Sequence, residues 1–131
     1  MLHATAHIGP ETMETQIQAG THPILADEPP SNGGRDAGPA PYELLLAALG
    51  ACTAMTLRMY ADRKGWRIES LDIDLRVLGT PEARHIKRTL TIAGPDEAGR
   101  ARLAEIAERT PVTLTLKQGI AIETHLAEQT A

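Results

Sequence analysis

Residues 33–65 read GGRDAGPAPYELLLAALGACTAMTLRMYADRKG and contain the only cysteine of the chain, Cys52. Every residue from Leu44 to Cys52 is apolar or glycine, which predicts a helix with no face for water and a place in the centre of a core. Charged residues then alternate with apolar ones, so the helix is expected to reach solvent beyond Cys52. Pro41 suits the first helical position and Gly65 suits a C′ stop, which predicts roughly 24 helical residues.

The thiol of Cys52 has two interpretations. Free cysteine is among the most buried residue types and behaves as a small hydrophobe, so packing alone could explain its position. A reactive cysteine must instead be a thiolate, and a nearby cation or helix N-terminus must then hold its pKa down. With one cysteine in the chain, redox chemistry has to run through Cys52 alone or with an outside thiol.

Composition limits the function classes. At 131 residues the chain is expected to form one domain, 1–131, and the absence of phenylalanine predicts an aliphatic core. The net charge of −4 argues against nucleic acid and membrane surfaces as partners. The longest apolar run is shorter than the roughly 18 to 20 residues that span a bilayer, and no signal sequence is evident, so a soluble cytoplasmic protein is expected. Five scattered histidines and the lack of a phosphate loop predict neither a metal nor a cofactor.

Hydrophobic alternation predicts strands on both sides of the long helix. The fold class predicted is α+β, with an antiparallel sheet wrapped around the central helix. Because so long an apolar helix is difficult to bury within one small chain, an interwoven homodimer is expected. The other elements expected are strands at 2–8, 13–19 and 22–27, a hairpin of strands at 66–78 and 85–93, a helix at 96–109, a short helix at 111–118 and a last strand at 120–126.

Three motifs resemble the OsmC/Ohr family of bacterial thiol peroxidases, and most closely its OsmC-like branch. They are HPILADEP at 22–29, GGxDxGPxPYELL at 33–45 and LGACT at 49–53. The resemblance implies a homodimer with two interface pockets, each built around a cysteine in the long helix. It also implies reduction of organic or fatty-acid hydroperoxides, assisted by an arginine and a glutamate. In the family, a second cysteine closes a disulfide that lipoylated proteins or small dithiols reduce.

The resemblance assigns roles residue by residue. Cys52 matches the peroxidatic cysteine, whereas Thr110 stands where the family carries its resolving cysteine. Tyr42 occupies the position of the family's glutamate, and Glu43 follows it. Arg35 is the only arginine before the long helix. The resemblance therefore implies a catalytic set of Cys52, Arg35 and Glu43.

Each assisting residue also has a plain structural interpretation. Arg35 could hold the thiolate or lie in solvent, and Glu43 could orient Arg35 or favour the helix dipole. Thr110 before a proline is an ordinary N-cap, and Tyr42 could pack in the core instead of touching a substrate. The expected lining of the substrate pocket is Tyr42, Leu49 and Thr110.

Two functions follow from these alternatives. In the first, Cys52 reduces an organic hydroperoxide, is oxidised to the sulfenic acid and is restored by an external thiol or dithiol. In the second, an apolar pocket at the dimer interface binds a small hydrophobic ligand without catalysis, and Cys52 is merely packed. Retention of the cysteine favours the first, and the missing resolving cysteine favours the second.

Overall fold

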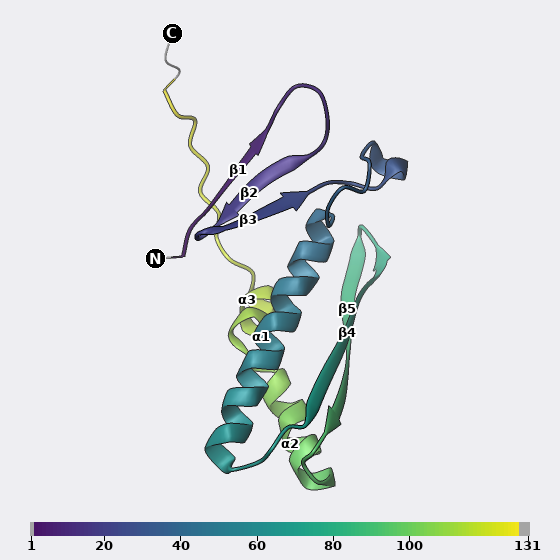
Figure 1. The fold of residues 1–131 in the computed structure, drawn as a ribbon, viewed down its shortest axis with the longest axis vertical. Coiled ribbons are helices and arrows are strands. Elements are labelled where there is room, and N and C mark those ends of the chain that lie inside the picture. Colours follow the sequence, from purple (N-terminus) through teal and green to yellow (C-terminus); the bar gives the residue numbers. More distant parts are fainter. Residues whose placement is uncertain (1, 129–131) are drawn as a thin grey trace. The chain divides into compact units, whose positions relative to one another are not determined.

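The computed structural model describes residues 2–128, and its elements follow the predicted α+β order as far as the short helix at 111–118 (Figure 1). An antiparallel sheet precedes the long helix, and a hairpin and two shorter helices follow it. The elements are β1 (Ala4–Ile8), β2 (Thr15–Ala19), β3 (His22–Ala26), a 3-10 turn η1 (Pro30–Asn32), α1 (Pro41–Lys64), β4 (Ser70–Thr80), β5 (Ala83–Ala93), α2 (Glu97–Ala107) and α3 (Pro111–Gln118).

Helix α1 has the bounds that the sequence predicted. It begins at Pro41, whose fixed φ suits the first helical position, and Gly65 follows its last residue with a φ of 73°. Glu43 in its first turn and Arg63 and Lys64 in its last turn match the helix dipole. The two ends of the helix are thus set by local chemistry.

The chain divides into two compact units, and the division runs through α1, β4 and β5. The first unit takes the residues up to 50 together with 74–89. Its sheet has the antiparallel order β1-β2-β3, with Ala6, Ile17 and Ile24 aligned across the three strands. The residues in phase with them are mostly apolar, so this sheet has one apolar face: Ala4, Ala6, Ile8, Thr15, Ile17, Ala19, His22, Ile24 and Ala26.

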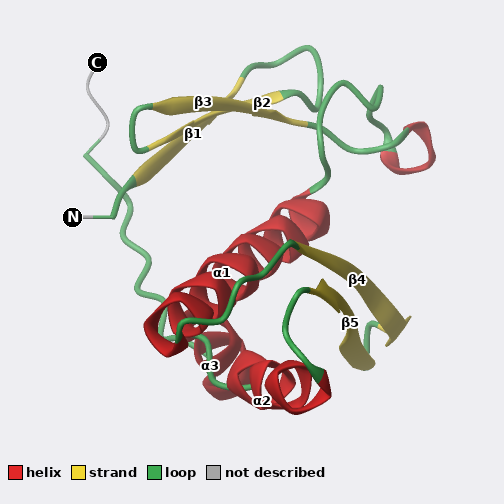
Figure 2. Ribbon diagram, turned by 60° about the horizontal axis from the view of Figure 1, so that its bottom comes forward, coloured by secondary structure: helices red, strands yellow, loops and turns green. Residues whose placement is uncertain are grey.

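The second unit takes residues 51–73 and the chain from 90 onward, and it holds the main core. Figure 2 shows α2 and α3 beside the second half of α1. Asp96 caps α2 by accepting a hydrogen bond from the Gly99 N–H at 2.8 Å. The buried residues that pack together are Leu57, Ala61, Ile68, Leu103 and Ala107.

The last predicted strand is absent from this chain. Residues 119–128 form no regular structure, and Ile120, Ile122 and Leu126 are 72%, 84% and 100% exposed. The period-2 pattern is present, but no neighbouring strand among the described residues pairs with it. Alternation therefore predicted a strand for which residues 2–128 supply no partner.

The apolar half of α1 is also less covered than its sequence predicted. Only 22% of its most apolar 18-residue window is buried, and Met55 and Met59 lie more than half exposed. By length and composition α1 could cross a membrane. This differs from the sequence estimate, which counted only uninterrupted apolar residues, because the mean hydropathy of 18 helical residues can stay high when Thr and Gly are among them. The core helix of a globular protein meets the same test.

Candidate functional site: a thiol facing a helix N-terminus

Cys52 lies in the middle of α1, in the second compact unit, and is half-buried. Its two neighbours in the sequence differ in burial, since Thr53 is fully buried and Ala51 is exposed. The thiol therefore stands at the border between the packed and the open face of the helix. That position gives the sulfur a fixed environment on one side and access on the other.

The backbone N–H of Val112 donates a hydrogen bond to Cys52 Sγ at 3.5 Å. Val112 is the second residue of α3, and Pro111 before it has no N–H, so this is the first free donor of the helix. The N-terminus of a helix carries a partial positive charge that favours anions. The sulfur therefore lies at the N-terminus of a helix, and the Thr56 hydroxyl adds a second contact at 3.9 Å.

Thr110 is the N-cap of α3, but its side chain does not cap the helix. Its hydroxyl is fully buried and lies 2.6 Å from the hydroxyl of Thr113, which itself donates to the carbonyl of Ala107 at 3.3 Å. The Thr110 and Thr113 hydroxyls are therefore hydrogen-bonded to each other. The N-cap oxygen is thus held away from the first N–H groups, and Val112 N–H faces the sulfur instead.

Arg35 lies in a loop that is organised around the buried carboxylate of Asp27. That carboxylate accepts hydrogen bonds from the backbone N–H groups of Glu28, Arg35 and Ala37 at 2.8 to 3.1 Å. The Ala37 N–H contributes most to holding the pKa of Asp27 below its usual value, and burial opposes it. The Asp27 side chain therefore fixes the backbone at Arg35.

The guanidinium of Arg35 pairs with Glu14, 2.7 Å away, and its side chain is 66% exposed. Neither Cys52 nor Glu43 is a partner in this hydrogen bond. Since Arg35 and Cys52 belong to different compact units, the approach of the guanidinium to the sulfur stays a prediction.

Glu43 and Tyr42 have local roles at the start of α1. The Glu43 carboxylate accepts a hydrogen bond from the Ala40 N–H at 2.9 Å, which is half of a capping box. Tyr42 is half-exposed, so the expectation that it packs in a core is wrong, and the Arg84 guanidinium lies 4.7 Å from its ring centre. The cation holds the ring at the surface of the first unit.

A match to a protein-family model shows the family to which this chain belongs. Residues 33–125, more than two thirds of the chain, match the family model described as OsmC-like protein. The chain belongs to the OsmC/Ohr family. No curated protein matches it in sequence.

Solved structures agree with the OsmC assignment in fold. The OsmC-like protein of Mycoplasma pneumoniae is 21% identical, with a TM-score of 0.75 and 92% of this chain and 89% of that chain covered. The organic hydroperoxide resistance protein OsmC of Legionella pneumophila is also 21% identical, with a TM-score of 0.69 and 89% of each chain covered. OhrB of Bacillus subtilis, an organic hydroperoxide resistance protein, is 18% identical, with a TM-score of 0.64 and coverages of 91% and 92%.

Sequence reasoning missed the groups that surround the thiol in this OsmC-like chain. The Val112 N–H and the Thr56 hydroxyl were not singled out, nor was Glu14 as the partner of Arg35. One signal was present: Pro111 at the first helical position makes the next residue the first N–H donor. The predicted pocket lining of Tyr42, Leu49 and Thr110 stays a prediction, although Leu49 and Thr110 are buried.

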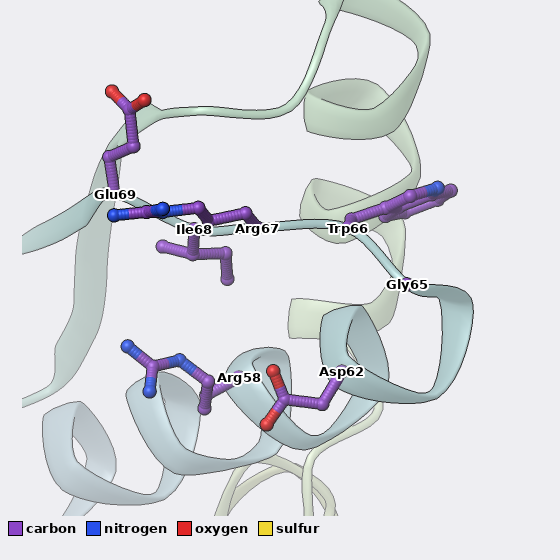
Figure 3. A pocket seen from close by; sticks show the side chains of 7 residues that line it. All are labelled: Arg58, Asp62, Gly65, Trp66, Arg67, Ile68 and Glu69. Carbon is purple, nitrogen blue, oxygen red and sulfur yellow. The ribbon is translucent and has the colours of Figure 1, made fainter.

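A separate open pocket of about 560 Å³ lies where α1 ends and the chain turns towards β4 (Figure 3). Cys52 is not among its lining residues, which are Arg58, Asp62, Gly65, Trp66, Arg67, Ile68 and Glu69. Two arginines are balanced there by two carboxylates, so the pocket favours neither sign of charge. Among residues 2–128, no group of three or more His, Cys, Asp and Glu side chains is placed to hold a metal ion.

Proposed function

We propose that this protein reduces organic hydroperoxides with Cys52 as its only redox residue, and that an external thiol restores it. The observation that carries the proposal is the hydrogen bond from the Val112 N–H to Cys52 Sγ, at the N-terminus of α3. Only the thiolate attacks a peroxide, and a helix N-terminus is one of the environments that favour it.

The chemistry needs two steps. The thiolate sulfur attacks the terminal oxygen of the hydroperoxide, the O–O bond breaks, and the alkoxide takes a proton to leave as the alcohol, with Cys52 as the sulfenic acid. An outside thiol then displaces water to form a mixed disulfide, and a second thiol reduces it. Thr110 has no sulfur, so an internal disulfide is excluded. A reducing, cytoplasmic setting would supply such thiols.

The assisting and binding roles form part of the same proposal. Arg35 would hold the peroxide oxygens or the thiolate once it leaves Glu14, and Glu43 would orient Arg35. Tyr42, Leu49 and Thr110 would line the apolar end of the substrate pocket. The names of the solved relatives from Legionella and Bacillus, both organic hydroperoxide resistance proteins, support this substrate class.

A second copy of the chain is part of the proposal, because one chain leaves the apolar side of α1 open. A stripe of small and flexible apolar residues is exposed along it: Ala47, Ala48, Ala51, Met55 and Met59. Cys52 borders this stripe, so a partner packed there would close the open side of the thiol. Sedimentation should give a dimer wherever the protein is folded, and a folded monomer at low micromolar concentration would contradict it.

One observation favours the alternative function, a binding module with an unreactive thiol. The guanidinium of Arg35 is engaged with Glu14, and the Glu43 carboxylate caps the helix. In that case the apolar surface beside Cys52 would hold a small hydrophobic ligand and no turnover would occur.

Intact mass spectrometry separates the two functions. After one equivalent of cumene hydroperoxide, the peroxidase predicts a gain of one oxygen at Cys52, and a mixed disulfide once a small thiol is added. Excess peroxide should carry the sulfur on to the sulfinic acid, because no second cysteine captures the sulfenic acid. An unchanged mass, with Cys52 reacting no faster than free cysteine, would contradict the peroxidase and leave the binding module as the remaining function.

A further inference from the structure

The first turn of α3 has the backbone of a capped helix but lacks the side-chain cap. Thr110 precedes the helix with φ −68° and ψ 154°, the extended conformation of an N-cap residue, yet its hydroxyl makes no capping hydrogen bond. A threonine in this place usually accepts from the N–H of the second or third helical residue, here Val112 or Thr113. A cap that the backbone permits is therefore not formed.

The hydroxyl of Thr113 engages the Thr110 side chain instead. The two oxygens lie 2.6 Å apart, and the Thr113 hydroxyl also donates to the carbonyl of Ala107, the last residue of α2, at 3.3 Å. Thr110 is fully buried and Thr113 is 5% exposed, so water hardly competes for these bonds. The Thr113 hydroxyl thus ties the Thr110 side chain to the end of the preceding helix.

The N–H that Thr110 leaves uncapped has the sulfur as its acceptor. The Val112 N–H donates to Cys52 Sγ at 3.5 Å. A thiol sulfur accepts hydrogen bonds only weakly, whereas a threonine hydroxyl oxygen is an ordinary acceptor with two lone pairs. A Thr110 hydroxyl that was free to cap the helix would therefore compete with Cys52 for this donor. The sulfur keeps the N–H because the competing oxygen is bound elsewhere.

We propose that Thr113 is a positioning residue for the thiol. Its hydroxyl holds the Thr110 side chain out of the capping position and thereby reserves the Val112 N–H for the sulfur of Cys52. The role rests on the proposed peroxidase function, since it gives that N–H a part in the reaction of the thiolate. Thr113 acts through its neighbours in the first turn of α3, so its effect on the sulfur depends on the Thr110 hydroxyl.

Alkylation of Cys52 by iodoacetamide tests this role without a peroxide. Thr113→Val removes the hydroxyl and keeps the shape of the side chain, which frees the Thr110 hydroxyl to accept from the Val112 N–H. The alkylation rate at neutral pH should fall about threefold or more, but less than in Val112→Pro, because the N–H is then shared and not deleted. Thr113→Ser restores the hydroxyl and should restore the rate. Thr115→Val, at an exposed threonine of the same helix, is the matched control and should not change it.

A double variant separates positioning from a loss of packing. In the Thr110→Val background no hydroxyl is left to form the cap, so adding Thr113→Val should not slow alkylation further. An equal slowing in both backgrounds would show a purely structural effect and overturn the positioning role, as would an unchanged rate in Thr113→Val alone. Urea unfolding curves show which variants fold, and Thr113→Ala, which also lacks the hydroxyl, takes the place of Thr113→Val if the latter does not fold.

Peroxide consumption, measured beside alkylation, separates a failure of this role from a failure of the proposed function. If the parent protein does not reduce cumene hydroperoxide while the alkylation rates follow the expected pattern, the peroxidase fails and the positioning role of Thr113 stands. If the parent protein reduces the peroxide while Thr113→Val is alkylated at the parent rate, the peroxidase stands and the positioning role is overturned.

Discussion

Asp27 and Cys52 are both acceptors held by backbone N–H groups, but they are held to different degrees. The Asp27 carboxylate takes three N–H donors at 2.8 to 3.1 Å and is only 3% exposed. The Cys52 sulfur takes one N–H donor at 3.5 Å and is half-buried. A fully satisfied acceptor shapes the backbone around it, whereas a partly satisfied acceptor keeps lone pairs for a reactant. The difference separates a structural acceptor from a candidate nucleophile.

The largest effect on activity is expected from replacing Cys52, the partly satisfied acceptor. Cys52→Ser should abolish peroxide consumption completely, because serine offers no thiolate at neutral pH. The fold should survive, since a hydroxyl can accept the same bond from the Val112 N–H. Peroxide consumption measures the loss of activity, and a urea unfolding curve shows whether the variant still folds. Residual turnover in the variant would show that another residue than Cys52 reduces the peroxide.

At the fully satisfied acceptor, Asp27→Asn should lower stability and leave the chemistry of the thiol unchanged. One Asp27 oxygen accepts from Glu28 and the other from Arg35 and Ala37, so an amide nitrogen in either place would face an N–H donor. The urea midpoint should fall. Asp36→Asn, at an exposed residue with a φ of 54° that Asn tolerates, is the matched control and should not change the midpoint.

The same residue predicts an acid dependence. The pKa of Asp27 is lower in the folded chain than its ordinary value of 3.8, so its contribution to stability is complete above 3.8 and is lost as the pH falls through the folded value. The stability difference between the parent protein and Asp27→Asn should therefore shrink in acid. A difference that stayed constant down to the lowest pH at which the protein folds would contradict this account.

The fold was predictable wherever local chemistry decides it. Pro41 and Gly65 marked the ends of α1, and Pro111 and Gly119 marked those of α3. The environment of the sulfur was not predictable, because the Val112 N–H is 60 residues away along the chain and only tertiary packing brings it to Cys52. The tail was mispredicted for a similar reason, since alternation records the faces of a strand but does not supply a neighbouring strand to pair with it.

A smaller effect on the reaction rate is expected from removing the backbone N–H that donates to Cys52. Val112→Pro deletes the N–H at a position in the first helical turn where proline is tolerated, and Val112→Ala keeps it. A hydrogen bond to a charged group contributes about 1.5 to 3 kcal/mol, so Val112→Pro should slow alkylation and peroxide reduction by about tenfold or more. Unfolding curves confirm that both variants fold. Equal rates for the two would show that the N–H does not activate the sulfur.

The smallest effect concerns the ion pair that competes with the proposed role of Arg35. The Arg35 side chain in the pair with Glu14 is 66% exposed, and exposed ion pairs contribute at most about 1 kcal/mol. If Arg35 must leave Glu14 to assist the thiol, Glu14→Gln should raise the rate of peroxide reduction by no more than about fivefold, while Arg35→Ala should lower it. If Arg35 has no role, neither substitution should change the rate, and the double variant distinguishes the two cases. A gain from Glu14→Gln that disappears when Arg35 is also replaced would establish that the gain passes through the guanidinium.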